Sequence, residues 1–96
     1  MSPKNKIKLN SLRKKLDKLD NRLLLLIKLR TNLVNNVIEI KQFKKEIVDK
    51  KRIDIILNKI RQKSKKMNID PQITNRIWKN MIWSYINYER KKFKKK

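Results

Sequence analysis

Leucine and valine recur at alternating four- and three-residue steps through the first third of the chain, which is typical of one face of a long α-helix. The positions are Leu12, Leu16, Leu19, Leu23, Leu26, Leu33 and Val37. The pattern predicts a helix of ~35 residues and ~50 Å. A chain of this size folds to a radius of gyration of only ~12–13 Å. A helix this long with an apolar face therefore needs a partner, most simply a second copy of the chain.

Two shorter helices are predicted after the long one. Residues 44–48 interrupt the rhythm, and Ile53, Ile56, Leu57 and Ile60 then share a helical face. Asp70 and Pro71 suit the N-cap and the first turn of a last helix. The expected helices span about 9–43, 49–66 and 71–90. We therefore expect one all-α domain over residues 1–96, with a long, a short and a medium helix and with frayed basic ends at 1–8 and 91–96.

Charged residues interrupt two of these apolar faces. Arg30 fills the gap between Leu26 and Leu33, and the face continues to Lys41. On the last helix, Trp78, Ile82 and Tyr85 lead to Glu89, while Trp78 and Trp83 are interpreted as packing residues. An ion on a buried face is costly unless it meets a partner or a charged ligand. Arg30, Lys41 and Glu89 therefore suggest a polar cavity inside a helical bundle.

Each of the basic candidates also has a simpler interpretation. Arg13 lies among lysines and arginines, where a solvated face is the simpler explanation. Arg30 could fix the register of a coiled coil, and Lys41 could extend its ammonium to water from the end of the face. Arg13 precedes Arg30 by 17 residues, which places it ~25 Å away and rotated by ~100°. It can serve the same kind of site only from the other chain.

The acidic candidates have simpler interpretations too. Asp49 suits an N-cap or an ion pair with Arg52, and Glu89 could pair with Arg90 or with a lysine of the basic end. The position of Glu89 on the apolar face favours burial instead. Taken alone, Asp49 is better explained by the simpler interpretation, whereas Glu89 stays a candidate for the cavity.

Composition narrows the chemistry. The chain has no glycine, alanine, cysteine or histidine, which argues against a zinc or other transition-metal site. The net charge of +21 attracts anions, whether nucleic acid or a small ligand, although drift toward lysine codons would also produce it. Residues 1–10 show no apolar segment of a signal peptide, and no apolar run approaches the ~20 residues of a membrane span. We expect a cytoplasmic protein without membrane contact.

The ordered set of these residues resembles the all-helical chorismate mutase family over about residues 9–90. The first helix carries the resemblance through Leu12-Arg13, Leu16-Asp17, Leu19-Asp20, Leu23, Leu26, Arg30, Leu33-Val34, Val37 and Lys41. The second does so through Asp49, Arg52 and Ile56-Leu57, and the third through Asp70-Pro71, Ile77-Trp78, Met81-Ile82, Ile86 and Glu89.

The resemblance implies an intertwined helical-bundle homodimer with two sites, each enclosed by both chains. Chorismate, a dianion with an enol-pyruvyl ether, would rearrange to prephenate in aromatic amino-acid synthesis, without a nucleophile, a cofactor or a metal. The enzyme then has only to hold the reactive conformer and stabilise charge on the ether oxygen.

The resemblance also implies roles for individual residues. Arg13 of the partner chain and Arg30 would bind carboxylates, with Arg52 assisting. Lys41 would donate to the ether oxygen and to a carboxylate. Asp49 would lie near the ring hydroxyl. Glu89 would hydrogen-bond the ether oxygen, which only accepts, so that Glu89 must be protonated.

Two positions depart from the family. Ile53 stands where the family has a glutamate that meets the ring hydroxyl, and Tyr85, among the substrate-binding candidates, stands where a serine is common. Members that resemble isochorismate-pyruvate lyase also carry an apolar residue at the first position, so a lyase acting on a related dianion is the alternative. A basic helical module that binds nucleic acid is a distant third hypothesis. The last helix has no face that looks suited to contacting bases, because Trp78, Ile82 and Tyr85 are spaced as core residues.

Overall fold

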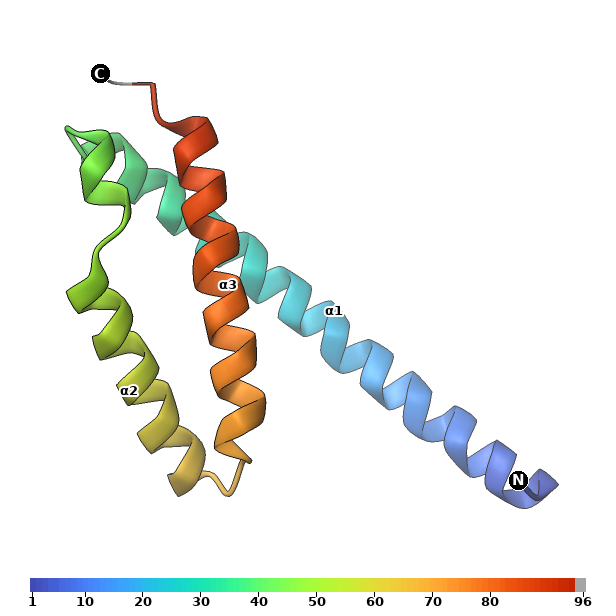
Figure 1. Cartoon of the computed structure of the whole chain (residues 1–96). Coiled ribbons are helices and arrows are strands. Elements are labelled where there is room, and N and C mark those ends of the chain that lie inside the picture. The colour runs from blue at the N-terminus through green and yellow to red at the C-terminus, as the bar shows by residue number, and fades with distance from the viewer. Residues whose placement is uncertain (95–96) are drawn as a thin grey trace. The chain divides into compact units, whose positions relative to one another are not determined.

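The computed structural model describes residues 1–94, and every regular element among them is helical (Figure 1). The α-helices are α1 (Pro3–Ile40), α2 (Lys50–Lys66) and α3 (Pro71–Lys92), and a short 3₁₀ helix, η1, covers Lys44–Ile47. The predicted all-α fold with a long, a short and a medium helix is confirmed. The chain divides into two compact units, Met1–Leu33 and Val34–Lys96, which are described separately.

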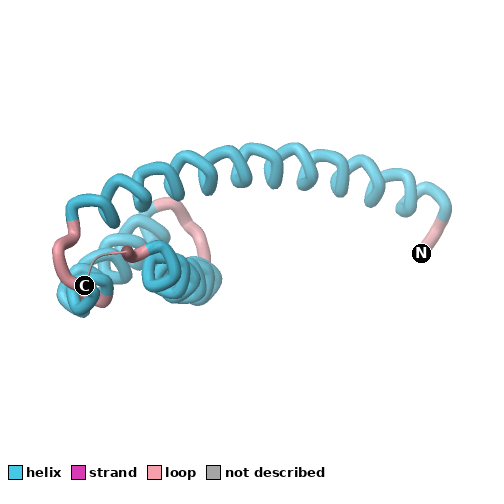
Figure 2. The backbone as a smooth tube through the Cα atoms, turned by 90° about the horizontal axis from the view of Figure 1, so that it is seen from above, coloured by secondary structure: helices cyan, strands magenta, loops and turns pink. Residues whose placement is uncertain are grey.

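The N-terminal unit consists of α1 up to Leu33, and the last turns of this helix belong to the C-terminal unit. Figure 2 shows α1 as one continuous helix. It begins at Pro3, so the expected start near residues 9–12 and the expected fraying of residues 3–8 were wrong. The Ser2 hydroxyl accepts the Asn5 amide at 3.2 Å, and Pro3 occupies the first helical position. Both features favour a helix start at this point. At the other end of the chain, residues 95–96 of the expected basic end lie outside the described residues.

The apolar face of α1 is exposed within one copy of the chain. Leu12, Leu16, Leu19, Leu23, Leu26 and Leu33 keep between 52% and 64% of their surface accessible. A contiguous row of exposed leucines is rare on a chain that functions alone and marks an interaction surface. The sequence pattern is therefore correct as a helix face, and its leucines form an exposed apolar row on α1.

The core of the C-terminal unit lies where η1 meets α2 and α3, which run side by side in Figure 1. Its centre is formed by Ile47, Ile82 and Ile86, with Val48, Ile53, Ile56, Leu57 and Phe93 packed against it. Buried hydroxyls add a polar link between the helices, since Ser64 and Thr74 lie 2.7 Å apart. The apolar faces predicted for the two shorter helices thus pack against each other.

The connections use side chains where other proteins often use glycine. Asn68 takes a positive φ of 58° after α2, a conformation that asparagine tolerates better than most residues. Asp70 then accepts the Gln72 amide at 2.9 Å and begins α3, as predicted. At the start of α2, Asp49 accepts the Arg52 amide at 3.0 Å. No helix among the described residues is long and apolar enough to span a membrane.

Candidate active site

The central feature of the candidate site is an ion pair between residues 48 positions apart in the sequence. Lys41 Nζ lies 3.3 Å from Glu89 Oε1, and their side chains are only 18% and 10% exposed. Lys41 directly follows α1, whose last turn it extends by a 3.2 Å hydrogen bond to the Val37 carbonyl. Glu89 comes from the inward face of α3. Both sequence candidates therefore meet, as the interrupted apolar faces suggested.

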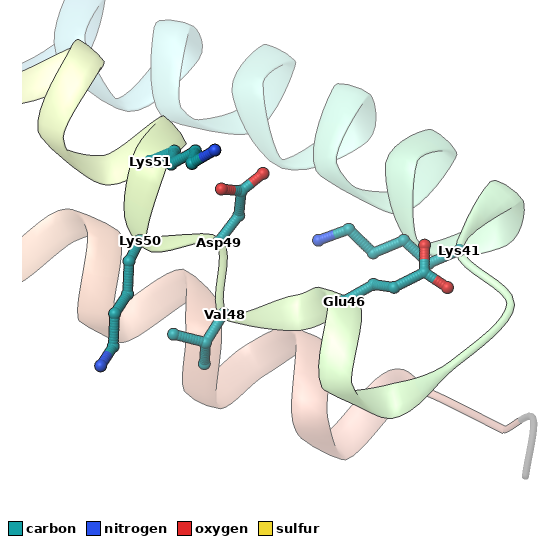
Figure 3. A pocket seen from close by; sticks show the side chains of 6 residues that line it. All are labelled: Lys41, Glu46, Val48, Asp49, Lys50 and Lys51. Atoms are coloured by element: carbon teal, nitrogen blue, oxygen red, sulfur yellow. The ribbon is translucent and has the colours of Figure 1, made fainter.

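A groove opens beside Lys41 and continues to the start of α2 (Figure 3). Its volume is about 510 Å³, and its lining consists of Lys41, Glu46, Val48, Asp49, Lys50 and Lys51. In Figure 3, Asp49 and Lys51 extend to one side of the segment and Lys50 to the other. The groove is lined by three ammonium groups and by the carboxylates of Glu46 and Asp49, so the lining is charged and only weakly positive.

The remaining candidates of the C-terminal unit lie around this groove and the ion pair. Asp49 lines the groove and also caps α2, so the simpler interpretation of Asp49 as an N-cap is confirmed. Arg52 is exposed one turn further along α2. Tyr85 is half-buried one turn before Glu89, with its ring edge-on to Tyr88 at 6.3 Å. Tyr88 in turn donates to Asn35 Oδ1 at 2.7 Å, which anchors α3 to the last turns of α1.

Arg13 and Arg30 belong to the N-terminal unit, on α1. Arg13 is exposed and Arg30 is half-buried. Since α1 is unbroken between them, they stay 17 positions apart on one rod, ~25 Å along the axis. Arg13 and Arg30 of one chain are therefore too far apart to contact the same small ligand.

The structure shows whether Ile53 and the two tryptophans pack in the core. Ile53 packs against the core of the C-terminal unit, so its side chain is structural. Trp78 is half-buried on the inward side of α3, as expected of a packing residue. Trp83, in contrast, keeps 51% of its surface exposed, and its interpretation as a packing residue was wrong within the single chain. It sits one position past the buried Ile82, which turns it away from the core.

Sequence reasoning missed four of the six residues that line the groove, namely Glu46, Val48, Lys50 and Lys51. Residues 44–48 were interpreted only as a connection, and the two lysines at the start of α2 were given no role. Glu46 is the one acidic residue in this connection. In the structure its carboxylate accepts the amides of Gln42 and Phe43 at 3.2 and 2.8 Å and thereby fixes the turn after α1. Among residues 1–94, no three acidic side chains gather in a way that could hold a metal ion.

Comparison with known proteins identifies the family. The model of the family described as chorismate mutase type II matches residues 12–90. The chain belongs to this family. A chorismate mutase of Methanocaldococcus jannaschii is 40% identical over 76 residues, which cover 78% of this chain and 77% of that protein. No solved structure matches the chain significantly.

Membership in the chorismate mutase type II family confirms the resemblance drawn from the sequence. It assigns the chain to the isomerases and connects it with aromatic amino-acid synthesis. Its match includes every candidate site residue, from Arg13 to Glu89. A chorismate mutase is therefore favoured over a module that only binds nucleic acid.

Proposed function

We propose that this chain converts chorismate to prephenate and that Lys41 and Glu89 act together on the ether oxygen of the substrate. The observation that supports this proposal is their 3.3 Å contact beside a groove lined by lysines. A pericyclic rearrangement breaks the ether C–O bond and forms a C–C bond within one molecule. It needs neither a nucleophile nor a cofactor, which suits the side chains present.

The catalytic demand is electrostatic. Negative charge develops on the ether oxygen as its bond to the ring lengthens, and a fixed cationic donor stabilises this charge more than the ground state. The Lys41 ammonium is the donor that the described contacts favour, because burial and the Glu89 pair restrict its motion. Arg30, Arg52 and Arg13 of a second copy would bind the two carboxylates through their guanidinium groups. Asp49 would lie near the ring hydroxyl.

The exposed face of α1 supports a homodimer. Six leucines in one row, each at least half exposed, would be covered by the same row of a second copy. We propose that the two copies intertwine and that each site takes Arg13 from the partner. Tyr85, where the family often has a serine, would line the same site from one turn before Glu89.

Ile53 supports a second candidate reaction. Its side chain is committed to the core, so position 53 offers no carboxylate to a ring hydroxyl. A lyase that expels pyruvate from isochorismate would share the fold, the dianion and the cationic groups. Chorismate stays the first choice because the named relative is a chorismate mutase.

Product analysis separates the two reactions. Purified protein incubated with chorismate should yield prephenate, and the same protein with isochorismate should release no pyruvate. Arg30→Ala and Lys41→Ala should lose most of this turnover, whereas Lys44→Ala, which removes an exposed charge nearby, should keep it. Release of pyruvate from isochorismate, without formation of prephenate from chorismate, would assign the chain as a lyase instead of a mutase. Wild-type turnover in both Arg30→Ala and Lys41→Ala would refute the site.

Glu89 should make the reaction depend on pH. An ether oxygen only accepts hydrogen bonds, so Glu89 assists in its protonated form and repels the substrate when ionised. In the structure without substrate it pairs with Lys41. The rate should therefore fall as pH rises.

The Glu89→Gln variant tests this dependence. Glutamine donates at every pH, so the profile of kcat/KM against pH should become flat while activity is kept at high pH. Glu46→Gln is the matched control, since it makes the same change in the groove on an exposed side chain and should leave the slope intact. If the slope of kcat/KM against pH is the same in Glu89→Gln as in wild type, Glu89 does not act through its proton.

A further inference from the structure

The outward face of α3 carries an exposed tryptophan among cations. Arg76, Lys79, Asn87 and Arg90 lie seven or four positions from Trp83, within about 40° of it around the helix. All five side chains are exposed. We call this set the outer stripe of α3. Ile86, Ile82 and Glu89 are buried and lie about 60°, 100° and 120° around the same helix from Trp83, so the outer stripe borders the buried face and shares no residue with the site described above.

The outer stripe carries positive charge without compensation from its own helix. Glu89 is the acidic residue of α3, and it is buried outside the stripe. The chain as a whole has 29 basic and 8 acidic residues, which adds a long-range attraction for polyanions. Trp83 is the aromatic member of the stripe, and 51% of its surface is exposed. An exposed indole offers a flat face on which a base can stack.

An aromatic ring between cations matches the chemistry of a single-stranded nucleic acid. A base can stack on the indole in any sequence, because every base has a π-face, while flanking cations contact the backbone. Lys79 lies ~6 Å along the helix from Trp83, and Arg76 and Arg90 lie ~10.5 Å to either side. The cations thus flank the indole in both directions along a strand. Asn87 adds an amide that can donate to a base or a phosphate.

We propose that the outer stripe of α3 binds single-stranded RNA, as an activity separate from the mutase reaction. A lipid surface is the competing partner, because Ile73 and Ile77 of α3 are also more than half exposed and a helix in a membrane interface uses a broad apolar face. The cations within about 40° of Trp83 favour the nucleic acid. The exposed indole also favours RNA over an acidic protein, because an acidic protein would need only the cations and not an aromatic ring. The proposal reverses our expectation that the last helix offers no surface for bases.

The test measures the anisotropy of a fluorescein-labelled oligouridylate of about 12 nucleotides, a length within the range that one single-strand site covers. Trp83→Ala should raise Kd about tenfold, as expected for the loss of one stacked base. Trp83→Phe, which keeps an aromatic ring, should restore most of the affinity. Chorismate turnover measured on the same samples should equal wild type in both variants, which shows that they are folded.

A pair of charge variants distinguishes RNA binding at the stripe from attraction by the net charge of the chain. The variant R76Q/K79Q/R90Q removes three charges from the stripe, and K63Q/K65Q/K66Q removes three exposed charges from α2. The stripe variant should bind the RNA far more weakly than the α2 variant and should show a shallower dependence of log Kd on log salt, by about 2.

Three results would overturn the proposal. One is equal affinity of Trp83→Ala and wild type for the RNA. Another is equal loss of affinity in the two charge variants, which would mean that only net charge attracts the strand. The third is binding to vesicles of phosphatidylcholine and phosphatidylserine that depends on Trp83, without binding to the oligouridylate, which would make the stripe a lipid contact.

Discussion

Replacing Lys41 with alanine should lower kcat for chorismate by about a hundredfold to a thousandfold, the range observed when one preorganised donor to a developing oxyanion is removed. The reason is specific to this chain. Lys41 is held by Glu89 at 3.3 Å in a position that is largely shielded from water, where a charge interacts more strongly than at the surface. KM should change less than kcat, because the charge on the ether oxygen grows in the transition state.

Two companion variants keep this result interpretable. Lys41→Ala leaves the buried Glu89 without the ammonium that it pairs with, which destabilises the fold on its own. The double variant Lys41→Ala/Glu89→Gln removes that uncompensated charge and should regain thermal stability without regaining activity. Lys44→Ala removes an exposed lysine three positions away and should turn over like wild type. Turnover of a folded Lys41→Ala protein at the level of Lys44→Ala would show that Lys41 is not the donor.

The meeting of Lys41 with Glu89 could be predicted from the sequence because both residues continue an apolar face. Burial of the inward face of α3 carries Glu89 inward, where an ion needs a partner of opposite charge. Lys41, at the end of the α1 face, supplies that partner. The caps at Asp49 and Asp70 could be predicted for a similar reason, since they depend on local residue types alone. Ile53 followed its apolar neighbours into the core.

Other features depend on geometry that periodicity does not encode. The groove lining at Glu46, Lys50 and Lys51 arises from a 3₁₀ turn whose path is fixed by hydrogen bonds to Glu46, and no hydrophobic pattern marks such a turn. Trp83 looked like a packing residue by type, and only its angular position on α3 turns it outward. The early start of α1 depended on one serine and one proline within an otherwise basic segment.

Arg13 should be essential, although it is exposed in the single chain. If it binds a substrate carboxylate across the dimer, Arg13→Ala should lower kcat/KM by about ten- to a hundredfold, the effect of losing a hydrogen bond to a charged group. Arg22→Ala is the matched control, because it removes an exposed arginine elsewhere on α1. Activity of Arg13→Ala equal to that of Arg22→Ala would exclude Arg13 from the site.

The central claim is that each site combines Lys41 of one copy with Arg13 of the other, and mixing two inactive variants tests it directly. Arg13→Ala and Lys41→Ala chains, unfolded together in equal amounts and refolded, should form mixed dimers in which one site has both side chains intact. Random pairing predicts a recovery of about a quarter of wild-type activity, because about half of the dimers are mixed and one of their two sites is complete. Activity no higher than the average of the two separately refolded variants would contradict the account.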